Sequence, residues 1–435
     1  MIEHKIELKD EKITPIRQKP YRIPESKKEE VKAELEKMLK RGIIEGSHSN
    51  WASPIVLIPK KDGTKRFCID YRKLNSVCKY DAYPIPRMDD ILEKVGSSKY
   101  LSNLDLTKGY WQIQVEPSSR ELTAFITPFG LYQFKMMPFG LNSAPSTFAR
   151  LMKMLLGGKE SFSDSYFDDT TVFSNSWQEH LSHLREVFTV ISKANLTIRP
   201  SKCVIGAPEI EVVGHVVGNG KIRTKIDKVK TIMDYPRPST KKELRAFLGL
   251  IGYYRKFIKD FATVALPLTD LTRKGKNVSV DWTTECEHSF GKLKKALLSD
   301  SVLATPDFGK LFTVQVDASN GGIGAVLSQT DDKGEEHPVQ YLSRKLLDRE
   351  RKYPTVEKEC LAIVWAVQQL HYYLCGREFE IQTDHRPLTW LERVKDKNQK
   401  LLRWSLVLQQ YSFKLTHKSG CQNINADALS RAFIN

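Results

Sequence analysis

The sequence lacks the cysteine spacing of a disulfide framework or a zinc site. Its seven cysteines are odd in number and far apart, and no C-x-x-C pair occurs among them. Long apolar runs are missing as well. No stretch approaches the roughly 18 residues of a membrane-spanning helix, and the opening MIEHKIELKD has no apolar signal-peptide core. These absences argue against a disulfide-stapled secreted domain and against a membrane protein, so we expect a soluble intracellular protein with buried thiols.

Acidic residues are outnumbered by basic ones. The 435 residues include 68 Lys and Arg against 52 Asp and Glu, which gives a formal net charge of +16. Such a surplus favours a polyanionic partner, because cations that neutralise phosphates release counterions. The charge alone leaves open a basic enzyme with no such partner. The chain has no repeat or low-complexity segment, and its length corresponds to about three folding units of ~150 residues.

The N-terminal part of the chain is predicted to alternate strands and helices. Ser26 and Glu29 form a capping box, which predicts a helix beginning there. The apolar residues expected on its buried face are Val31, Leu35 and Leu39. Two apolar-rich segments of PIVLIPKKDGTKRFCIDYRKL then flank Asp62-Gly63, a pattern that predicts a hairpin with a basic tip.

The remainder is predicted to hold a lysine-rich helical region and a further α/β unit. Thr240 and Glu243 form another capping box, followed by apolar residues at the i, i+3, i+4, i+7 spacing of an amphipathic helix. These apolar residues are Leu244, Phe247, Leu248 and Ile251. From about Lys310, strand and helix signals follow the order βββαβαβα, which is typical of a mixed α/β domain.

Carboxylates stand where a folded core would not place them. Asp105 lies between Leu104 and Leu106 in an apparent strand, and Asp168 and Asp169 occupy the turn of a predicted hairpin in SYFDDTTVFS. Each segment alone has an ordinary explanation, a paired structural acid or a polar turn. Brought together, two such charges at 4 Å would repel by ~4 kcal/mol at an effective dielectric constant of 20. The cluster would then require protons or a cation such as Mg²⁺, and two such ions can drive an in-line displacement.

Longer motifs surround these acids. SPIVLIPKKDGTKRFCIDYRKLN precedes LDLTKGYWQI, and TAFITPFGLYQFKMMPFGLNSAPSTF, YFDD and ELRAFLGLIGYYRKFI follow in that order. The sequence resembles the reverse transcriptases of gypsy-type (Metaviridae) LTR retrotransposons over essentially its whole length. The resemblance implies an α+β right-hand polymerase, with an N-terminal extension at 1–20, fingers and palm at 21–220 and a thumb/connection at 221–309.

The resemblance also implies roles for individual residues of the polymerase. Asp105, Asp168 and Asp169 correspond to the family's catalytic, metal-binding aspartates. Relatives usually carry apolar residues around this turn, and the positions that depart from the pattern here are Ser165, Thr170 and Thr171. Threonine still suits a strand and all three carboxylates are present, so the departure bears on the level of activity.

A second set of residues is implied to bind the incoming nucleoside triphosphate. Arg66, with Lys60 or Lys61, matches fingers residues that grip its phosphates, since guanidinium and ammonium donors suit phosphate oxygens. Tyr110 matches the aromatic residue beneath the nucleotide sugar. The residues implied to line the nucleotide pocket and template are Phe139 and Gly140. The alternatives are a solvated hairpin tip for the lysines and simple core packing for the aromatic rings.

The C-terminal region carries a second set of acids. Asp317 and Asp384 each end an apparent strand, Glu359 borders the apolar stripe of a helix, and Asp427 opens the last helix. Asp384 has an alternative explanation as a turn residue, and Asp427 as a helix N-cap. Four acids converging on one sheet edge would again require divalent metal.

The segments VDAS, EKECLAIV, TDHRPL and HKSGCQNINADALSR resemble the ribonuclease H domain that follows the polymerase in this family. The resemblance implies an α/β ribonuclease H-like domain with a mixed sheet at 310–435, in which the four acids are catalytic and bind metal. It also makes His417 the histidine of a mobile loop, able to shuttle a proton or help product release. His385 is the rival candidate and is interpreted as structural.

The sequence therefore predicts an enzyme with two Mg²⁺-dependent activities, each using two ions that Mn²⁺ could replace. One is RNA- and DNA-directed synthesis of DNA from deoxynucleoside triphosphates, on an RNA template and a DNA primer. The other is hydrolysis of the RNA strand of an RNA–DNA hybrid, for which contacts to the 2′-hydroxyl can select the RNA.

Two alternative functions fit the sequence less well. A domesticated nucleic-acid-binding relic would have lost a carboxylate, and none of the seven is missing. An RNA-dependent RNA polymerase is disfavoured by Tyr110 and by the ribonuclease region. Because no protease, integrase or zinc-knuckle segment is visible, we expect a polyprotein fragment acting in cytoplasmic virus-like particles, without a membrane. The sequence leaves the oligomeric state open.

Overall fold

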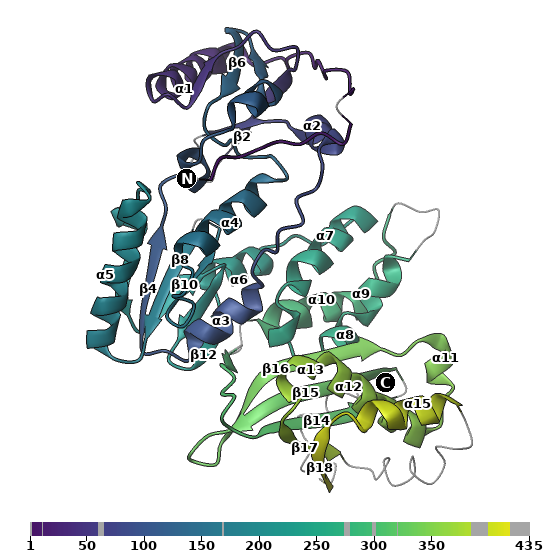
Figure 1. Cartoon of the computed structure of the whole chain (residues 1–435). Helices are drawn as coiled ribbons and strands as arrows, with labels where there is room; N and C mark the ends of the chain where they lie inside the picture. Colours follow the sequence, from purple (N-terminus) through teal and green to yellow (C-terminus); the bar gives the residue numbers. More distant parts are fainter. Residues whose placement is uncertain are drawn as a thin grey trace. The chain divides into compact units, whose positions relative to one another are not determined.

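A computed structural model describes residues 2–10, 12–59, 65–167, 169–273, 279–297, 302–319, 321–383 and 399–417 (Figure 1). The backbone alone is described at Pro59, Lys65, Arg66 and His417. The chain divides into two compact units, Met1–Val213 and Gly214–Asn435. In the described ranges, no helix has both the length and the apolar character needed to cross a membrane.

The first unit alternates short strands with helices. Its strands are β1 (Ile44–Gly46), β2 (Ser53–Pro59), β3 (Lys65–Ile69), β4 (Tyr100–Asp105), β5 (Phe125–Thr127), β6 (Gly130–Phe134), β7 (Ser163–Tyr166), β8 (Asp169–Ser174), β9 (Val204–Ala207) and β10 (Glu209–Val212). Its helices are α1 (Lys28–Lys40), α2 (Arg72–Val77), α3 (Met88–Gly96), α4 (Ala144–Leu155) and α5 (Trp177–Lys193).

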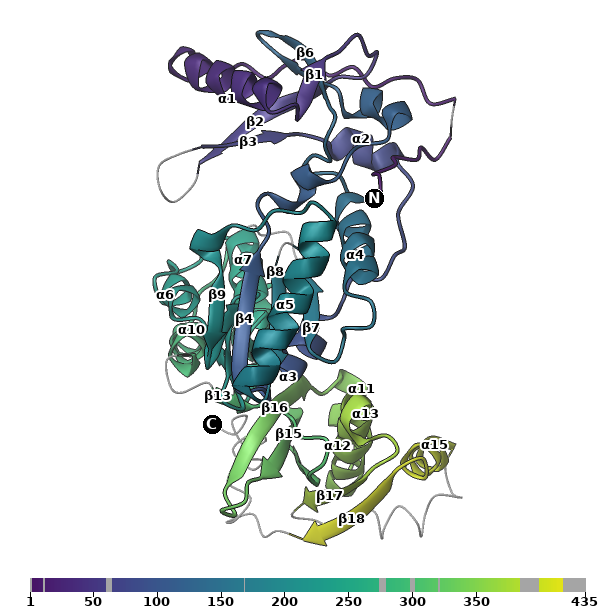
Figure 2. The same ribbon diagram turned by 60° about the vertical axis from the view of Figure 1, so that its left-hand side comes forward.

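Two sheets organise this unit. One has the order β1-β6-β5-β2-β3, with β2 and β5 parallel and the other pairs antiparallel. The other has the order β7-β8-β4-β9 and is antiparallel throughout. Helix α5 packs along β4 and β8 (Figure 2). Leu101, Leu104 and Val172 are fully buried, so apolar side chains fix these central strands.

The second unit begins with short strands and helices and ends in a larger sheet. Its strands are β11 (His215–Gly218), β12 (Lys221–Thr224), β13 (Val302–Ala304), β14 (Phe312–Ala318), β15 (Gly322–Thr330), β16 (Glu336–Lys345), β17 (Glu378–Thr383) and β18 (Ser412–His417). Its helices are α6 (Ile226–Met233), α7 (Lys241–Gly252), α8 (Phe261–Val264), α9 (Leu266–Leu271), α10 (Thr284–Ala296), α11 (Asp348–Arg351), α12 (Thr355–Gln369), α13 (His371–Leu374) and α15 (Gln399–Leu408).

The larger sheet is mixed, as the sequence predicts. Its order is β16-β15-β14-β17-β18, with the first three strands antiparallel and β17 parallel to both β14 and β18. Helix α12 packs against β14 and β15, and α8 packs against β16. Strands and helices follow the predicted order as far as β18, and the predicted terminal helix lies outside the described residues.

The first helix differs from its prediction. Helix α1 begins at Lys28, with Lys27 as an N-cap that makes no side-chain capping bond, so the capping box of Ser26 and Glu29 is wrong. The buried residues of this helix are Val31, Leu35 and Met38. Leu39 is 39% exposed, because eight residues overshoot two turns by ~80° whereas seven nearly complete them.

The capping box at Thr240 and Glu243 is confirmed. The Glu243 N–H donates to Thr240 Oγ1 at 3.2 Å, and α7 begins directly after Thr240. Leu244, Phe247 and Ile251 are buried as expected, whereas Leu248 is only partly buried.

Candidate active sites

Asp105 and Asp169 lie opposite each other on neighbouring strands. Strand β4 ends at Asp105, β8 begins at Asp169, and the antiparallel register pairs the two residues directly. Directly opposed residues project to the same face, with Cβ atoms about 4.5–5.5 Å apart. Phe167, in the turn between β7 and β8, has a φ of 52°, in the left-handed region. Asp168, the next residue, lies outside the described residues.

A lysine that the sequence analysis missed pairs with the first of these acids. Lys202 Nζ lies 3.1 Å from Asp105 Oδ2, across a separation of 97 residues. The Arg199 N–H donates to the Asp105 carbonyl at 2.8 Å, which holds the segment carrying Lys202 against the end of β4. No local sequence signal indicates this pairing, because it depends on how distant segments come together.

The two carboxylates share one electrostatic environment. Burial raises the pKa of Asp169, and the neighbouring charge of Asp105 raises this pKa further. A hydrogen bond from the Asn103 side chain and the charge of Lys202 act in the opposite direction. The raised pKa indicates a carboxylate that is partly withdrawn from water and would be stabilised by a nearby cation.

A chain of hydrogen bonds braces the strands that carry these acids. The Gly206 N–H donates to Ser102 Oγ at 2.9 Å, and Ser102 Oγ is also hydrogen-bonded to His180 Nε2 at 2.7 Å. Ser174 Oγ is hydrogen-bonded to His180 Nδ1 at 2.9 Å and to His183 Nδ1 at 2.8 Å. Burial lowers the pKa of His180, which favours the neutral ring. The relay joins β4, β8, β9 and α5.

The residues predicted to contact the nucleotide form an aromatic group. Tyr110, in the 3-10 helix Gly109–Gln112, stacks on Phe139 with ring centroids 5.1 Å apart and packs against Phe148 at 5.5 Å. Phe139 is 43% exposed, so the stack reaches the surface. Gly140 has a φ of 99°, a conformation that favours glycine, and its carbonyl accepts from Asn75 Nδ2 at 2.9 Å.

The fingers residues are described in part. Strands β2 and β3 pair antiparallel with Ile58 opposite Arg66, which confirms the two strands of the predicted hairpin. Lys60 and Lys61 lie outside the described residues, as does the Asp62-Gly63 turn, and only the backbone of Arg66 is described. The role of these cations in triphosphate binding stays a prediction.

In the second unit, two of the four predicted acids are described. Asp317 lies in β14 and is 3% exposed; Glu359 lies in α12 and is 1% exposed. Glu359 was predicted at the border of an apolar stripe, but α12 is buried over most of its surface and this side chain lies inside. Carboxylates so withdrawn from water require a proton, a cation or hydrogen-bond donors.

The other predicted residues of this region lie at the end of the described residues or outside them. Strand β17 ends at Thr383, and Asp384, His385 and Asp427 lie outside the described residues. His417 ends β18, where only its backbone is described. Their roles stay predictions.

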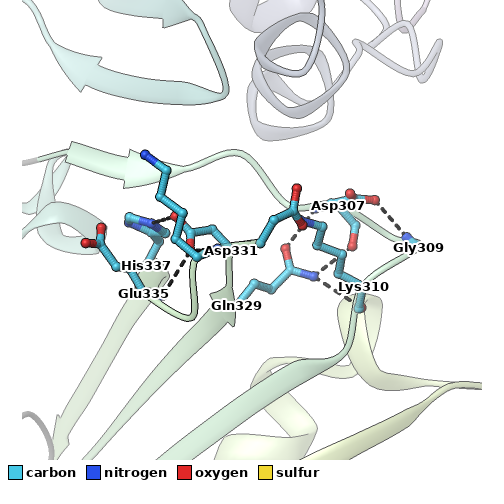
Figure 3. Close-up of polar contacts among 9 residues, drawn as sticks. Asp307, Gly309, Lys310, Gln329, Asp331, Glu335 and His337 are labelled. Carbon is cyan, nitrogen blue, oxygen red and sulfur yellow. Dashed lines mark hydrogen bonds and ion pairs between the residues drawn. The ribbon is translucent and has the colours of Figure 1, made fainter.

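A separate acidic group sits at the end of the β15–β16 hairpin (Figure 3). Within the described ranges, Asp331, Glu335 and His337 form one group of three metal-ligating side chains whose ligand atoms lie within 4.8 Å of one another. Asp331 Oδ1 accepts the N–H groups of Lys333 and Glu335, both at 2.9 Å. His337 Nε2 lies 3.0 Å from Asp331 Oδ2, and this hydrogen bond lowers the pKa of Asp331 to about 2. These hydrogen bonds stabilise the turn between β15 and β16, so they do not by themselves indicate a metal site.

Two family models match the chain where these acids lie. Residues 58–217 match reverse transcriptase (RNA-dependent DNA polymerase), and residues 307–411 match the RNase H-like domain found in reverse transcriptase. The chain therefore contains a segment similar to reverse transcriptase, followed by a segment similar to the RNase H-like domain found with it. Asp105 and Asp169 fall in the first matched segment, and Asp317 and Glu359 in the second.

Curated relatives confirm the resemblance to gypsy-type retrotransposons. The chain is 42% identical, over 97% of its length, to the retrovirus-related Pol polyprotein from transposon 297 of Drosophila melanogaster. It is 38% identical, over 93% of its length, to the Pol polyprotein from transposon gypsy of the same organism. The chain spans 40% of the length of each of these relatives.

Solved structures confirm the fold class. A foamy viral protease-reverse transcriptase in complex with dsDNA superposes with a TM-score of 0.86, covering 96% of this chain and 88% of that chain at 22% identity. A dRH form of the foamy viral enzyme, also with dsDNA, gives 0.85 over 95% of this chain and 74% of that chain, at the same identity. The α+β polymerase and α/β ribonuclease H-like folds predicted from the sequence are therefore confirmed.

Proposed function

We propose that this chain copies RNA and DNA templates into DNA and degrades the RNA strand of the resulting hybrid. The observation that carries the proposal is the register of β4 and β8, which sets Asp105 directly opposite Asp169. Both acids lie within the segment that matches the reverse transcriptase family. Paired carboxylates at this position suit transfer of a nucleotidyl group.

The donor set of the first site fits divalent metal ions. Carboxylate oxygens are hard ligands that suit Mg²⁺ and Mn²⁺, and Asp169, partly buried beside Asp105, concentrates negative charge that a cation would neutralise. We propose that Asp105, Asp168 and Asp169 hold two Mg²⁺ ions. When bound, such ions lower the pKa of an attacking hydroxyl and stabilise the charge of a leaving pyrophosphate. Strands β4 and β8 fix the carboxylates on rigid elements, which keeps their geometry constant.

The incoming deoxynucleotide would lie against the aromatic group. The Tyr110 ring stacks on Phe139 and packs at a tilt against Phe148, and these contacts would hold it in place beside the sugar. In the proposal, Arg66 and Lys60 or Lys61 approach the triphosphate from the fingers hairpin, where cationic donors match phosphate oxygens. Gly140 keeps the backbone beside Phe139 in a conformation that other residues rarely adopt.

The second unit would hydrolyse RNA. We propose that Asp317, Glu359, Asp384 and Asp427 hold a second pair of Mg²⁺ ions, with His417 moving a proton or helping product release. The burial of Asp317 and Glu359 supports this, because a cation compensates buried negative charge. The family match at 307–411 covers three of the four acids.

The substrates follow from chemistry and from the structural neighbours. Foamy viral protease-reverse transcriptase has been solved with dsDNA and with an RNA/DNA hybrid. The net charge of +16 fits the same polyanions here. In the proposal, the chain takes an RNA template, a DNA primer and deoxynucleoside triphosphates, as part of a polyprotein product within cytoplasmic virus-like particles.

One assay tests both activities. Primer extension on a labelled RNA template with Mg²⁺ should give DNA and degraded template in the same tube. Asp105→Asn should stop extension and leave cleavage of a preformed hybrid intact, since an amide is a poor Mg²⁺ ligand beside carboxylates. Glu359→Gln should do the reverse, lowering cleavage at least about a hundredfold.

A neighbouring acid of the same helix supplies the control. Glu357→Gln alters a residue that pairs with Lys400, and we expect cleavage to persist. Extension by Asp105→Asn, or cleavage by a folded Glu359→Gln variant, would place the chemistry elsewhere. A wild-type chain that binds hybrid but performs neither reaction would support a nucleic-acid-binding relic instead.

A further inference from the structure

We propose that Gln112 is a positioning residue of the polymerase, which fixes the distance between Tyr110 and the end of the strand that carries Asp105. This inference rests on the proposed function, in which Tyr110 lies beneath the nucleotide sugar and Asp105 holds metal. Gln112 closes the 3-10 helix Gly109–Gln112, two residues after Tyr110. It is not among the residues that the family resemblance assigns to the site.

The chain continues to pair with a distant segment after β4 ends at Asp105. The Arg199 N–H donates to the Asp105 carbonyl at 2.8 Å, and the Thr107 N–H donates to the Thr197 carbonyl at 2.9 Å. An antiparallel bridge lies between these two hydrogen bonds. The backbone that leaves the strand of Asp105 is therefore fixed to this second segment as far as Thr107.

The Gln112 side chain binds the end of this pairing with both polar atoms of its amide. Its Nε2 donates to the carbonyls of Thr107 at 2.8 Å and Thr197 at 3.0 Å. Its Oε1 accepts the Thr197 N–H at 2.7 Å and the Thr197 hydroxyl at 3.3 Å. A side-chain amide offers two hydrogens and two lone pairs, so its full bonding capacity is used here. Only one orientation of the amide satisfies these partners, because the Thr197 N–H can only donate.

The same short helix carries Tyr110 against the aromatic group. The Tyr110 ring stacks on Phe139 and packs at a tilt against Phe148. Ile113, directly after the helix, is fully buried, and its N–H donates to the Tyr110 carbonyl at 3.2 Å. A 3-10 helix of four residues has little rigidity of its own, because its hydrogen bonds have poor geometry. The side-chain bonds of Gln112 therefore supply the firm attachment to the strand end that the helix itself lacks.

This attachment bears on how a nucleotide would be held. In the proposed site the sugar lies against Tyr110 while the phosphates reach the metal at Asp105. Misplacing reacting groups by about 1 Å can cost on the order of 100-fold in rate. Steric selection against a 2′-hydroxyl likewise needs the ring at a fixed place beneath the sugar. Loss of the Gln112 bonds should therefore weaken sugar selection without removing any group that contacts the nucleotide.

Backbone hydrogen bonding offers a simpler explanation for this glutamine. The Thr107 carbonyl and the Thr197 N–H lie at the end of the pairing, and backbone polar groups require partners. On that account Gln112 contributes to stability alone. Its replacement would lower the melting temperature and leave the selection between ribo- and deoxynucleotides unchanged, whereas the proposal predicts a change in that selection.

The test measures sugar selection in the full chain. Gln112→Met keeps a side chain of similar length and removes its hydrogen bonds, so the ratio of kcat/KM for a ribonucleotide over its deoxy counterpart should rise roughly three- to tenfold. Gln112→Glu keeps an oxygen for the Thr197 N–H but sets an acceptor against two carbonyls, and it should raise the ratio as well. Gln114→Met, at an exposed glutamine two positions further along, is the matched control and should leave the ratio unchanged. An unchanged ratio in both Gln112 variants would overturn the proposal.

A double-mutant cycle shows whether Gln112 acts through Tyr110. In a Tyr110→Val background, Gln112→Met should change the ratio by less than about twofold, because the ring that Gln112 positions is gone. A further rise there as large as in the wild-type background would overturn the proposal. A melting curve and cleavage of a preformed hybrid, which the second unit would perform, show for each variant that the chain is folded.

The same data separate failure of this inference from failure of the proposed function. If Tyr110→Val raises the ratio and the Gln112 variants do not, only this inference fails. If the wild-type chain extends no primer, or if Tyr110→Val leaves the ratio unchanged, the proposed nucleotide site fails and this inference fails with it.

Discussion

Lys202 Nζ lies 3.1 Å from Asp105 Oδ2, so a cation of the chain itself contacts the acidic pair of the first site. The Lys202 side chain is 54% exposed and that of Asp105 is 20% exposed. A pair with this much solvent access adds little to stability. It does, however, compete for the same oxygen that a metal ion would bind, and this competition has a measurable consequence.

Replacing Lys202 with Met should lower the Mg²⁺ concentration that gives half-maximal DNA synthesis by roughly two- to fivefold, the equivalent of one partly exposed ion pair. Met keeps the apolar stem and removes the competing charge. A Mg²⁺ titration of primer extension measures the effect, and Lys202→Arg, which keeps the charge, serves as control. An unchanged Mg²⁺ requirement in Lys202→Met would show that the lysine leaves Asp105 before the ion binds.

Because its pKa is raised, Asp169 should lower the stability of the folded chain in metal-free buffer, and this effect should depend on pH. The folded state holds the proton more tightly than the unfolded state, so stability falls as pH rises from the ordinary carboxyl pKa through the raised value. Asn carries no charge, so Asp169→Asn should melt about 2 °C higher at neutral pH. The gain is modest because solvent screens a partly exposed group.

Melting curves across pH check this expectation. The difference should vanish below a pH of about 3, where the carboxyl is protonated in both states. Asp332→Asn is the matched control, because the Asp332 side chain is 94% exposed. A lower melting temperature for Asp169→Asn at neutral pH would contradict the assigned burial cost.

Tyr110→Val should admit ribonucleotides. The ring is held by stacking on Phe139 and by a tilted contact with Phe148, and a fixed ring beneath the sugar would exclude a 2′-hydroxyl by steric clash. We expect the ratio of kcat/KM for a ribonucleotide over its deoxy counterpart to rise on the order of tenfold or more. Tyr110→Phe keeps the ring and should keep the discrimination. Equal losses of kcat/KM for both nucleotides, together with a lower melting temperature, would show that Tyr110 only packs in the core.

Thr170→Val should stabilise the sheet beneath the first site. Thr170 is fully buried, and its Oγ1 has no hydrogen-bond partner among the described residues. Valine has the same shape without the hydroxyl, so we expect a gain of about 1 kcal/mol in the free energy of unfolding. Thr123→Val is the contrasting control, because Thr123 Oγ1 donates to the Arg120 carbonyl and accepts the Phe134 N–H. Denaturant unfolding should show opposite signs for the two variants.

Local patterns were sufficient where the structure is local. The capping box at Thr240 needs only the residues of one helix turn, and it is present. The strand ending at Asp105 could be predicted from the apolar residues Leu104 and Leu106 on either side of this acid. The start of α1 could not, because the backbone before Lys28 already turns as a 3-10 helix and leaves Ser26 unable to cap.

Contacts between distant segments account for what the sequence did not reveal. Lys202 is 97 residues from Asp105, and the His180 relay depends on strands that meet only in the folded sheet. In each case a polar side chain acquires its role from packing, and packing between segments has no signature in the local order of residues.

The pairing of β4 with β8 makes strand alignment itself a determinant of activity. A slip of one residue would turn every side chain of β8 to the other face. Asp169 would then no longer share a face with Asp105, and Val172, which is buried in the correct register, would turn to the face that carries Asp105. Such a misaligned chain would keep its content of helix and strand, so its circular dichroism spectrum would resemble that of the native protein. Cation binding would report the error, because the proposed metal site requires Asp105 and Asp169 on the same face of the sheet.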